Sequence, residues 1–229
     1  MSNEICDEVL PALSQSFLEF EGVSVDFLEL GVDAILKNDL LKDIPVVGLF
    51  TSILKVSYNL HERNLSKKML VFFKTLNDGS ISREKLVEYQ KTLSKNPKKL
   101  EKELGRVMLF LNRHTEYTQS QVLAKFYQAY IAQRISWEQF CELTVANERM
   151  FPNDYAILRG INKERKIRRD TSYDDSYQSD RLVSLGLVSK TSNANVRNIG
   201  EAMRWESELS AVSVIIDTTP FGKLFCELL

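Results

Sequence analysis

The residues from Thr118 to Thr144, TQSQVLAKFYQAYIAQRISWEQFCELT, decide the fold class of this chain. Apolar side chains recur in them every three or four positions, first at Val122, Phe126 and Tyr130 and then again from Trp137. This spacing places the apolar side chains on one face of a helix. The stretch therefore predicts two successive α-helices.

Two capping signatures mark where these helices should begin. Thr118 is followed three residues later by Gln121, and Ser136 is followed in the same way by Gln139. In such a capping box, the hydroxyl and the amide each accept a hydrogen bond from a backbone N–H that the helix leaves unpaired. Each signature is in phase with the apolar stripe behind it, so we predict a helix start at both.

Helical spacing also dominates the residues that precede this stretch. The polar turn Asn77-Asp78-Gly79 and the helix breaker Pro97 separate three further apolar stripes. These stripes are Leu65, Met69, Phe72, Phe73 and Leu76; Leu86, Tyr89 and Leu93; and Leu100, Leu104, Val107, Met108 and Leu111. Helices joined by short turns are typical of a bundle, which we predict over residues 23–160.

The most apolar segment runs from Ile44 to Leu54, about half of the ~20 residues needed to cross a bilayer. We interpret it as a buried core helix. A bundle hairpin that inserts into a membrane is the alternative, and it would make the protein a membrane-perturbing effector. The residues of this core or membrane helix are Ile44, Val47, Phe50, Ile53 and Leu54.

Charge is distributed unevenly although the net charge is only −1. The first 36 residues contain eight acidic residues and neither Lys nor Arg. We predict an acidic arm over residues 1–22, which either covers a basic surface or forms a solvated helix face. A charged linker is predicted over residues 161–179. Its basic residues Lys163, Arg165, Lys166, Arg168 and Arg169 are candidates for contact with nucleic-acid phosphates, because basic side chains neutralise that backbone.

The residues needed for common catalytic and metal sites are missing from the sequence. The chain has two histidines and three cysteines, none at metal-ligand spacing. Both histidines fall near predicted helix ends, where a cation is favoured. No phosphate-binding loop or Gly-x-Ser-x-Gly elbow occurs, and Asn77–Ser82 lacks the ligands of a calcium loop. We therefore expect no enzyme activity, no catalytic or metal residue and no cofactor.

Two features of the sequence bear on localisation. The odd, widely spaced cysteines indicate reduced thiols rather than a disulfide framework. The first residues lack the basic and apolar regions of a signal peptide. We expect a soluble cytoplasmic protein.

The C-terminal residues predict a small mixed unit over residues 180–229. A short helix from Asp180 to Leu185 ends at Gly186, and the β-branched run Val212–Ile216 predicts a strand. Thr218 or Thr219 then caps a last helix that has Pro220 in its first turn.

One resemblance concerns the first part of the chain. The run LKDIPVVG from Leu41, followed by ERNLSKK from Glu62 and by Phe72-Phe73, resembles uncharacterised bacterial helical proteins similar to the Abi-alpha type, which are linked to phage exclusion and abortive infection. The resemblance covers about residues 25–158 and supplies no catalytic residue. It implies a prophage or phage-defence component that acts through protein contacts.

A second resemblance concerns the C-terminus. Arg181-Leu182 with the run LGLV from Leu185 resembles the end of a recognition helix and the first wing strand of a winged helix. The run IIDTTPFGK from Ile215 resembles the returning strand and last helix, with Thr-x-x-Gly. The long insertion Ser189–Ala211 departs from that pattern. Because winged helices dock proteins as well as DNA, the fold does not decide the ligand.

These observations predict a mainly α protein, a multi-helix bundle with a small C-terminal α+β winged-helix-like module. The leading hypothesis is a non-enzymatic interaction protein of phage defence with a protein partner. The alternatives are a DNA-binding regulator that uses the C-terminal module and the membrane effector described above. We regard a membrane partner as the less favoured one and leave homo-oligomerisation open.

Overall fold

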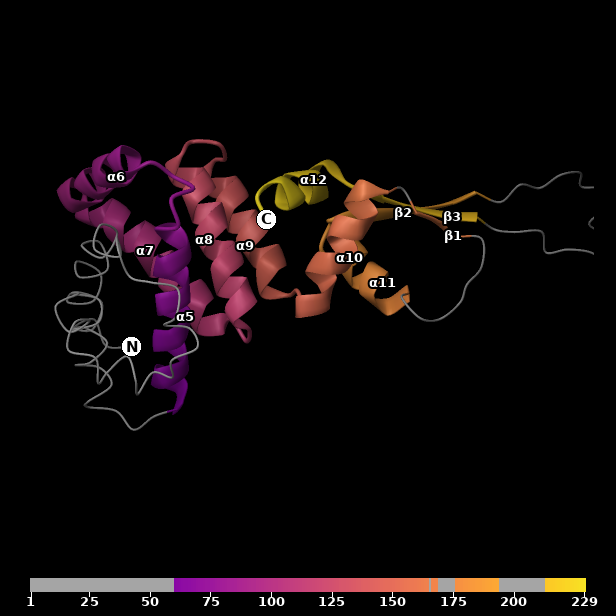
Figure 1. The fold of residues 1–229 in the computed structure, drawn as a ribbon, viewed down its shortest axis with the longest axis horizontal. Coiled ribbons are helices and arrows are strands. Elements are labelled where there is room, and N and C mark those ends of the chain that lie inside the picture. The colour runs from indigo at the N-terminus through magenta and orange to yellow at the C-terminus, as the bar shows by residue number, and fades with distance from the viewer. Residues whose placement is uncertain (1–59, 165, 169–175, 194–212) are drawn as a thin grey trace, which may run out of the picture. The chain divides into compact units, whose positions relative to one another are not determined.

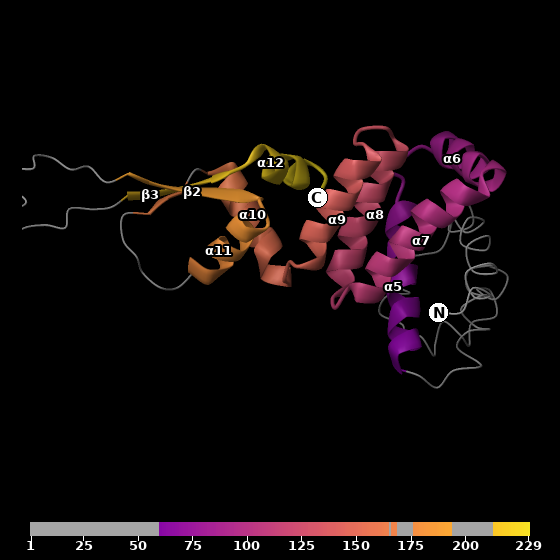
Figure 2. The ribbon, with the colours of Figure 1, turned by 180° about the vertical axis from the view of Figure 1, so that it is seen from behind.

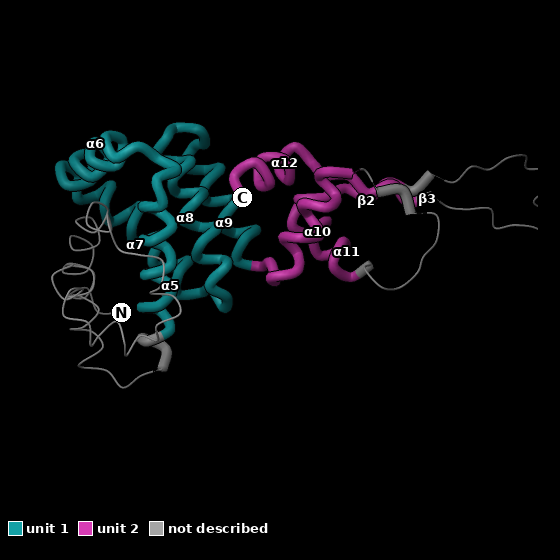
Figure 3. Tube along the Cα trace, in the orientation of Figure 1, with its two compact units in different colours: residues 1–148 teal, residues 149–229 magenta. Residues whose placement is uncertain are grey.

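The computed structural model describes residues 60–164, 166–168, 176–193 and 213–229 (Figure 1). These residues are mainly helical, with a small antiparallel sheet in the C-terminal part, as the sequence predicted. The chain divides into two compact units, residues 1–148 (unit 1) and residues 149–229 (unit 2), coloured separately in Figure 3.

The described part of unit 1 consists of helices joined by short turns. They are α5 (Leu60–Leu76), α6 (Arg83–Lys95), α7 (Pro97–Arg113), α8 (Tyr117–Ile131) and α9 (Trp137–Glu148). Each of the apolar stripes expected between Leu65 and Thr144 lies in one of these helices, and the views from front and back show α8 beside α9 (Figures 1 and 2).

The helix breaks lie where the turn residues indicated. After α5, Gly79 takes a positive φ of 88°, a conformation that glycine adopts without a steric penalty. The Asp78 carboxylate accepts a hydrogen bond from the Ser80 N–H at 2.9 Å and another from the Gln128 amide of α8 at 3.0 Å. Pro97 occupies the first turn of α7.

One capping box is confirmed and the other is wrong. At the start of α9, the Ser136 N–H donates to Gln139 Oε1 at 2.9 Å and the Gln139 N–H donates to Ser136 Oγ at 3.2 Å. Helix α8 instead begins at Tyr117, where Gln119 Oε1 accepts from the Glu116 N–H at 3.1 Å. The same Gln119 amide donates to the Glu148 carbonyl of α9 at 3.0 Å. The start of α8 at Tyr117 is thus accompanied by a contact between α8 and α9, which the local sequence pattern does not reveal.

The core of unit 1 is centred on α8. Its aromatic residues Phe126 and Tyr127 are fully buried, and the Tyr127 ring lies 5.9 Å from Phe72 of α5 and 5.4 Å from Phe140 of α9, centroid to centroid. Buried residues occur around the whole circumference of α8, as expected for a helix surrounded by others. Burial of large aromatic side chains of this kind dominates the stability of such a core.

Unit 2 combines helices with a three-stranded sheet. Its elements are α10 (Pro152–Lys163), β1 (Lys166–Arg168), α11 (Ser176–Ser184), β2 (Val188–Asn193), β3 (Ser213–Thr218) and α12 (Pro220–Glu227). The strand order is β1-β3-β2 and both pairings are antiparallel. Lys166 lies opposite Ile216, and Val188 lies opposite Thr218.

The short helix, the strand and the last helix predicted for the C-terminal residues are confirmed. Helix α11 is followed by Gly186 at a φ of 72°, and strand β3 covers most of the predicted β-branched run. Thr219 caps α12, because its Oγ1 accepts from the Gly222 N–H at 2.9 Å. The same hydroxyl donates to the Gly186 carbonyl at 2.6 Å, so the start of α12 is fastened to the turn between α11 and β2.

The division into units differs from the predicted one. Unit 2 begins at Arg149, so α10 belongs to it although the sequence placed those residues in a bundle over 23–160. The predicted linker over 161–179 contains the end of α10, strand β1 and the start of α11. Strand β1 is Lys-Ile-Arg. It has a single apolar residue, so its strand structure depends on pairing with β3 and leaves no alternation to detect.

Candidate functional site

The best-defined polar arrangement in unit 2 begins with a buried carboxylate. Asp154, in the first turn of α10, is 0% exposed, and its Oδ2 accepts the Phe151 N–H at 2.8 Å. Arg181 of α11 donates to both of its oxygens, from Nε at 2.8 Å and from Nη2 at 2.6 Å. A bidentate pair of this kind is stronger and more directional than a single hydrogen bond. It joins α10 to α11.

The guanidinium of Arg181 lies against two exposed aromatic rings. It is 4.6 Å from the centroid of Phe151 and 5.8 Å from that of Tyr177. The two rings are 58% and 60% exposed. Contacts of a guanidinium with ring faces are attractive at these distances. We call the three residues the Phe151–Arg181–Tyr177 surface.

This surface is suited to binding rather than to proton transfer. The hydrogen bonds that Arg181 donates to Asp154 raise the pKa of the guanidinium, which keeps it charged at every relevant pH. Aromatic residues and arginine are enriched at protein interfaces and among the residues that contribute most to binding. From the sequence, Arg181 was recognised only as part of a helix end, because its spatial partners Asp154 and Phe151 lie 27 and 30 residues earlier in the chain.

Helix α11 carries little positive charge for a nucleic acid. Its sequence, SYQSDRLVS, contains one acidic and one basic residue. The basic residue, Arg181, is already bonded to Asp154, and the acidic residue, Asp180, forms an ion pair with Lys190 of β2. Because phosphate neutralisation dominates nucleic-acid affinity, this helix face is a weak electrostatic partner for DNA.

The basic residues that the sequence proposed for nucleic-acid contact are only partly described. Lys163 is exposed in the last turn of α10, and the backbones of Lys166 and Arg168 lie in β1. Arg165 and Arg169 lie outside the described residues. The structure therefore does not bring the five together in one described surface.

The proposed core or membrane helix and the acidic arm, residues 1–22, also lie outside the described residues. These concern Ile44, Val47, Phe50, Ile53 and Leu54, and the membrane alternative stays a prediction. In the ranges that the structure describes, no helix is long and apolar enough to span a bilayer.

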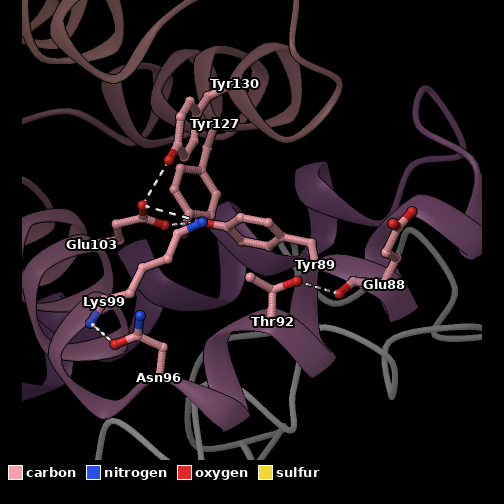
Figure 4. Close-up of polar contacts among 8 residues, drawn as sticks. All are labelled: Glu88, Tyr89, Thr92, Asn96, Lys99, Glu103, Tyr127 and Tyr130. Carbon is pink, nitrogen blue, oxygen red and sulfur yellow. Dashed lines mark hydrogen bonds and ion pairs between the residues drawn. The ribbon is translucent and has the colours of Figure 1, made fainter.

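Unit 1 contains a second polar cluster, shown in Figure 4. Glu103 of α7 is 4% exposed and accepts hydrogen bonds from the hydroxyls of Tyr89 and, at 2.6 Å, Tyr130. The Tyr89 and Tyr127 hydroxyls are 3.0 Å apart, and Lys99 Nζ lies 3.8 Å from Glu103 Oε1. Burial raises the pKa of each phenol, so the tyrosines remain neutral donors. We assign this cluster to the fold, because a carboxylate this buried does not reach a substrate.

A buried imidazole and a hydroxyl meet elsewhere in unit 1. His114 Nδ1 lies 3.1 Å from Ser120 Oγ, the residue pair used in nucleophilic catalysis. His114 is 2% exposed and Ser120 is 0% exposed, so neither reaches a substrate. Burial, together with the charge of Lys68, lowers the pKa of His114 to about 3.

The sequence led us to expect a cationic histidine at the C-terminal end of α7, but His114 does not supply that charge. His114 follows α7 as its C-cap and is neutral, while the Lys68 ammonium of α5 donates to the His114 carbonyl. A cation at a helix C-terminus is favoured by the aligned peptide dipoles. No local pattern indicates this contact, because 46 residues separate Lys68 from His114.

Thiol and metal chemistry gain no support from the described residues. Burial raises the pKa of the Cys141 thiol and of the Cys226 thiol, which lowers the thiolate fraction that a nucleophile needs. Across the described ranges, no group of three or more His, Cys, Asp or Glu side chains is placed to hold a metal ion.

Comparisons of the chain with protein-family models, with curated proteins and with solved structures gave no match.

Proposed function

We propose that this chain is a non-enzymatic interaction protein that docks a partner protein on the Phe151–Arg181–Tyr177 surface. The observation that carries the proposal is the pair of exposed aromatic rings around an arginine that the buried Asp154 already holds in place. Isolated exposed aromatic residues are common. Two that flank one guanidinium form a small apolar surface with a charged centre.

The fixed geometry of Arg181 supports the proposal energetically. Binding normally costs about 0.5–1.5 kcal/mol for each flexible side chain that becomes immobilised. Arg181 is already bonded through Nε and Nη2, so most of that ordering precedes binding. Its Nη1 donates no hydrogen bond to any residue that the structure describes. A partner that presents an acceptor beside an apolar side chain would fit this arrangement.

The resemblance of residues 25–158 to Abi-alpha-type proteins supports a biological setting. We infer that the partner is a component of a phage-defence system or of an infecting phage. Such a role requires recognition and a change of assembly rather than a reaction centre. The buried positions of Glu103, His114 and Ser120 agree with a role of this kind.

The proposal is tested by placing a photoreactive amino acid at position 177 of the full chain, in cells with and without phage. We expect one crosslinked product of defined mass, which disappears when Phe151→Ser is added. Phe151 is suitable because its side chain is 58% exposed, so its loss leaves the core intact. The matched control carries the photoreactive residue at Glu227, which is also exposed in unit 2. The proposal would be contradicted by the same product from both positions. It would also be contradicted if Phe151→Ser left the yield of the product unchanged.

A second candidate function is DNA binding by unit 2. Its support is the order helix, strand, strand, helix from α11 to α12, with β2 and β3 paired antiparallel, which is the arrangement that the winged-helix resemblance implies. A mobility-shift titration across a salt series tests it, because a phosphate contact strengthens at low salt. Lys163→Glu should weaken the complex. Absence of a complex at the lowest salt concentration rules out this function.

A further inference from the structure

Helices α7 and α9 of unit 1 present two stripes of residues at helical spacing. All of these residues are exposed or half-buried. The α7 stripe consists of Lys102, Gly105, Arg106, Leu109 and Arg113, and the α9 stripe consists of Glu138, Cys141, Glu142, Val145 and Glu148. The α7 stripe is basic and the α9 stripe is acidic.

The two stripes lie side by side and run in the same direction. Near the ends of both helices, Arg113 is 3.8 Å from Glu148. Near their starts, Glu138 has its pKa lowered by its own backbone N–H, by the Ser136 hydroxyl and by the charge of Lys102. Residue numbers therefore increase together along α7 and α9, with Lys102 on the side of Glu138 and Arg113 beside Glu148.

The middle of this face is apolar and has a notch. Leu109 is 51% exposed and Val145 is 45% exposed, each about one helical turn before the Arg113–Glu148 pair. A Cβ at Gly105 would meet no atom within 4 Å in the described part of the chain. Glycine is unfavourable inside a helix, and here the packing within the described residues does not require it.

We propose that this face binds a second copy of the chain across a two-fold axis parallel to α7 and α9. Such an axis places α7 of one copy over α9 of the other, with equivalent levels facing each other. Lys102 and Arg106 then meet the partner's Glu138 and Glu142, and Leu109 meets the partner's Val145. The partner's Cys141 lies over Gly105, where the missing side chain leaves room.

Charge selects this axis over the other two-fold arrangement. An axis perpendicular to the helices would place α7 on α7, and so basic stripe on basic stripe. Like charges in contact oppose association, whereas complementary charges fix the register. A two-fold interface must be complementary to itself. A face with one basic and one acidic helix in register meets that requirement in the first arrangement alone.

The test uses sedimentation equilibrium of the full chain and two charge-reversed variants. Variant A carries Lys102→Glu and Arg106→Glu, and variant B carries Glu138→Lys and Glu142→Lys. We expect the wild-type chain to dimerise and each variant alone to dimerise at least tenfold more weakly. An equimolar mixture of A and B should recover the wild-type dissociation constant. Mixing does not repair a variant that has lost its own fold, so this recovery separates the interface from a folding defect.

Two further variants complete the test. Lys91→Glu with Lys95→Glu makes the same charge change at exposed positions of α6 and should leave the dissociation constant unchanged. Gly105→Leu fills the notch and should weaken the dimer at least tenfold, while it raises the melting temperature of the chain at concentrations where the chain is monomeric, because leucine favours a helix. A wild-type chain that sediments as a monomer at all concentrations would overturn the proposal. So would a mixture of A and B that fails to recover association.

Discussion

The two units stabilise their buried carboxylates in different ways. In unit 1, Glu103 accepts hydrogen bonds from neutral phenols, and its nearest cation, Lys99, is 3.8 Å away. In unit 2, Asp154 is bonded to a guanidinium through two contacts shorter than 3 Å. The first carboxylate lies inside an aromatic core, and the second lies under a surface that Arg181 reaches from outside.

The two units also differ in how closely other atoms approach their helical glycines. A Cβ at Gly105 in unit 1 would meet open space within the described residues, whereas a Cβ at Gly222 in unit 2 would lie 1.9 Å from the Leu187 carbonyl oxygen. A small unit buries a smaller fraction of its surface. Unit 2 therefore depends more on a few close contacts, and single substitutions should affect it more strongly.

The largest effect is expected from Asp154→Ala. Removal of one partner from a buried ion pair costs about 4 kcal/mol, and this change also leaves the Phe151 N–H without its acceptor. Denaturant unfolding combined with hydrogen exchange should show that α10 and α11 lose protection while α8 keeps it. Uniform loss across both units would contradict the assignment of this pair to unit 2 alone. Asp154→Asn, which keeps an acceptor, should be milder.

Gly222→Ala should destabilise unit 2 by about 3 kcal/mol, near the upper end for overpacking. The neighbouring atom belongs to the backbone, so α12 must move away from Leu187. Thermal unfolding followed by amide exchange of α12 measures the effect. A variant with unchanged stability would show that α12 does not approach the turn this closely.

Glu103→Ala should destabilise unit 1 by about 2–3 kcal/mol, because the Tyr89 and Tyr130 hydroxyls lose a charged acceptor. Glu103→Gln keeps one acceptor and should lose about half as much. The tyrosine cluster makes ultraviolet difference spectra a direct readout of its environment. If Glu103→Gln were the more harmful variant, the phenols would not be the main partners of this carboxylate.

His114 should make unit 1 sensitive to acid. Its pKa of about 3 in the fold lies below the usual 6.5, so below pH ~6.5 the unfolded chain binds a proton that the folded chain does not. The resulting stability is complete above pH 6.5 and is lost as the pH falls toward 3, by about 2 kcal/mol between pH 7 and pH 5. His114→Asn should flatten the unfolding free energy over that interval. An unchanged slope would show that the imidazole is solvated.

The smallest effect is expected from Gly105→Ala, which should stabilise unit 1 by about 0.8 kcal/mol through helix propensity. Gly105→Ala and Gly222→Ala make the same chemical change, but their expected effects on the free energy of unfolding have opposite signs. Equal destabilisation by both substitutions would remove the contrast between the two units. Thermal melts at a protein concentration where the chain is monomeric provide the measurement.

The sequence predicted the elements that depend on local patterns. Periodicity located α5 to α9, and Ser136 with Gln139 marked the start of α9. Strand β3 followed from its β-branched run, because such residues suit a pleated surface. Thr219 and Pro220 marked the beginning of α12.

The remaining features depend on contacts between residues far apart in the chain. Strand β1 forms by pairing with β3, some 48 residues later, so its basic residues looked like a linker. The Phe151–Arg181–Tyr177 surface was missed for the same reason, since Asp154 and Arg181 belong to different helices. Asp154, the third residue of a helix that begins at Pro152, was a local signal for the cap, but it did not indicate Arg181.

The position of β3 in the sheet has a consequence for synthesis of the chain. It is the central strand, yet it follows both of its neighbours in the sequence. Until the ribosome has made β3, the edges of β1 and β2 lack their native partner, and unpaired edges are templates for aggregation. Unit 1 is built from local helices and can fold meanwhile. A translational pause or a premature stop before residue 213 would therefore leave a folded unit 1 attached to β1 and β2, whose unpaired edges promote aggregation.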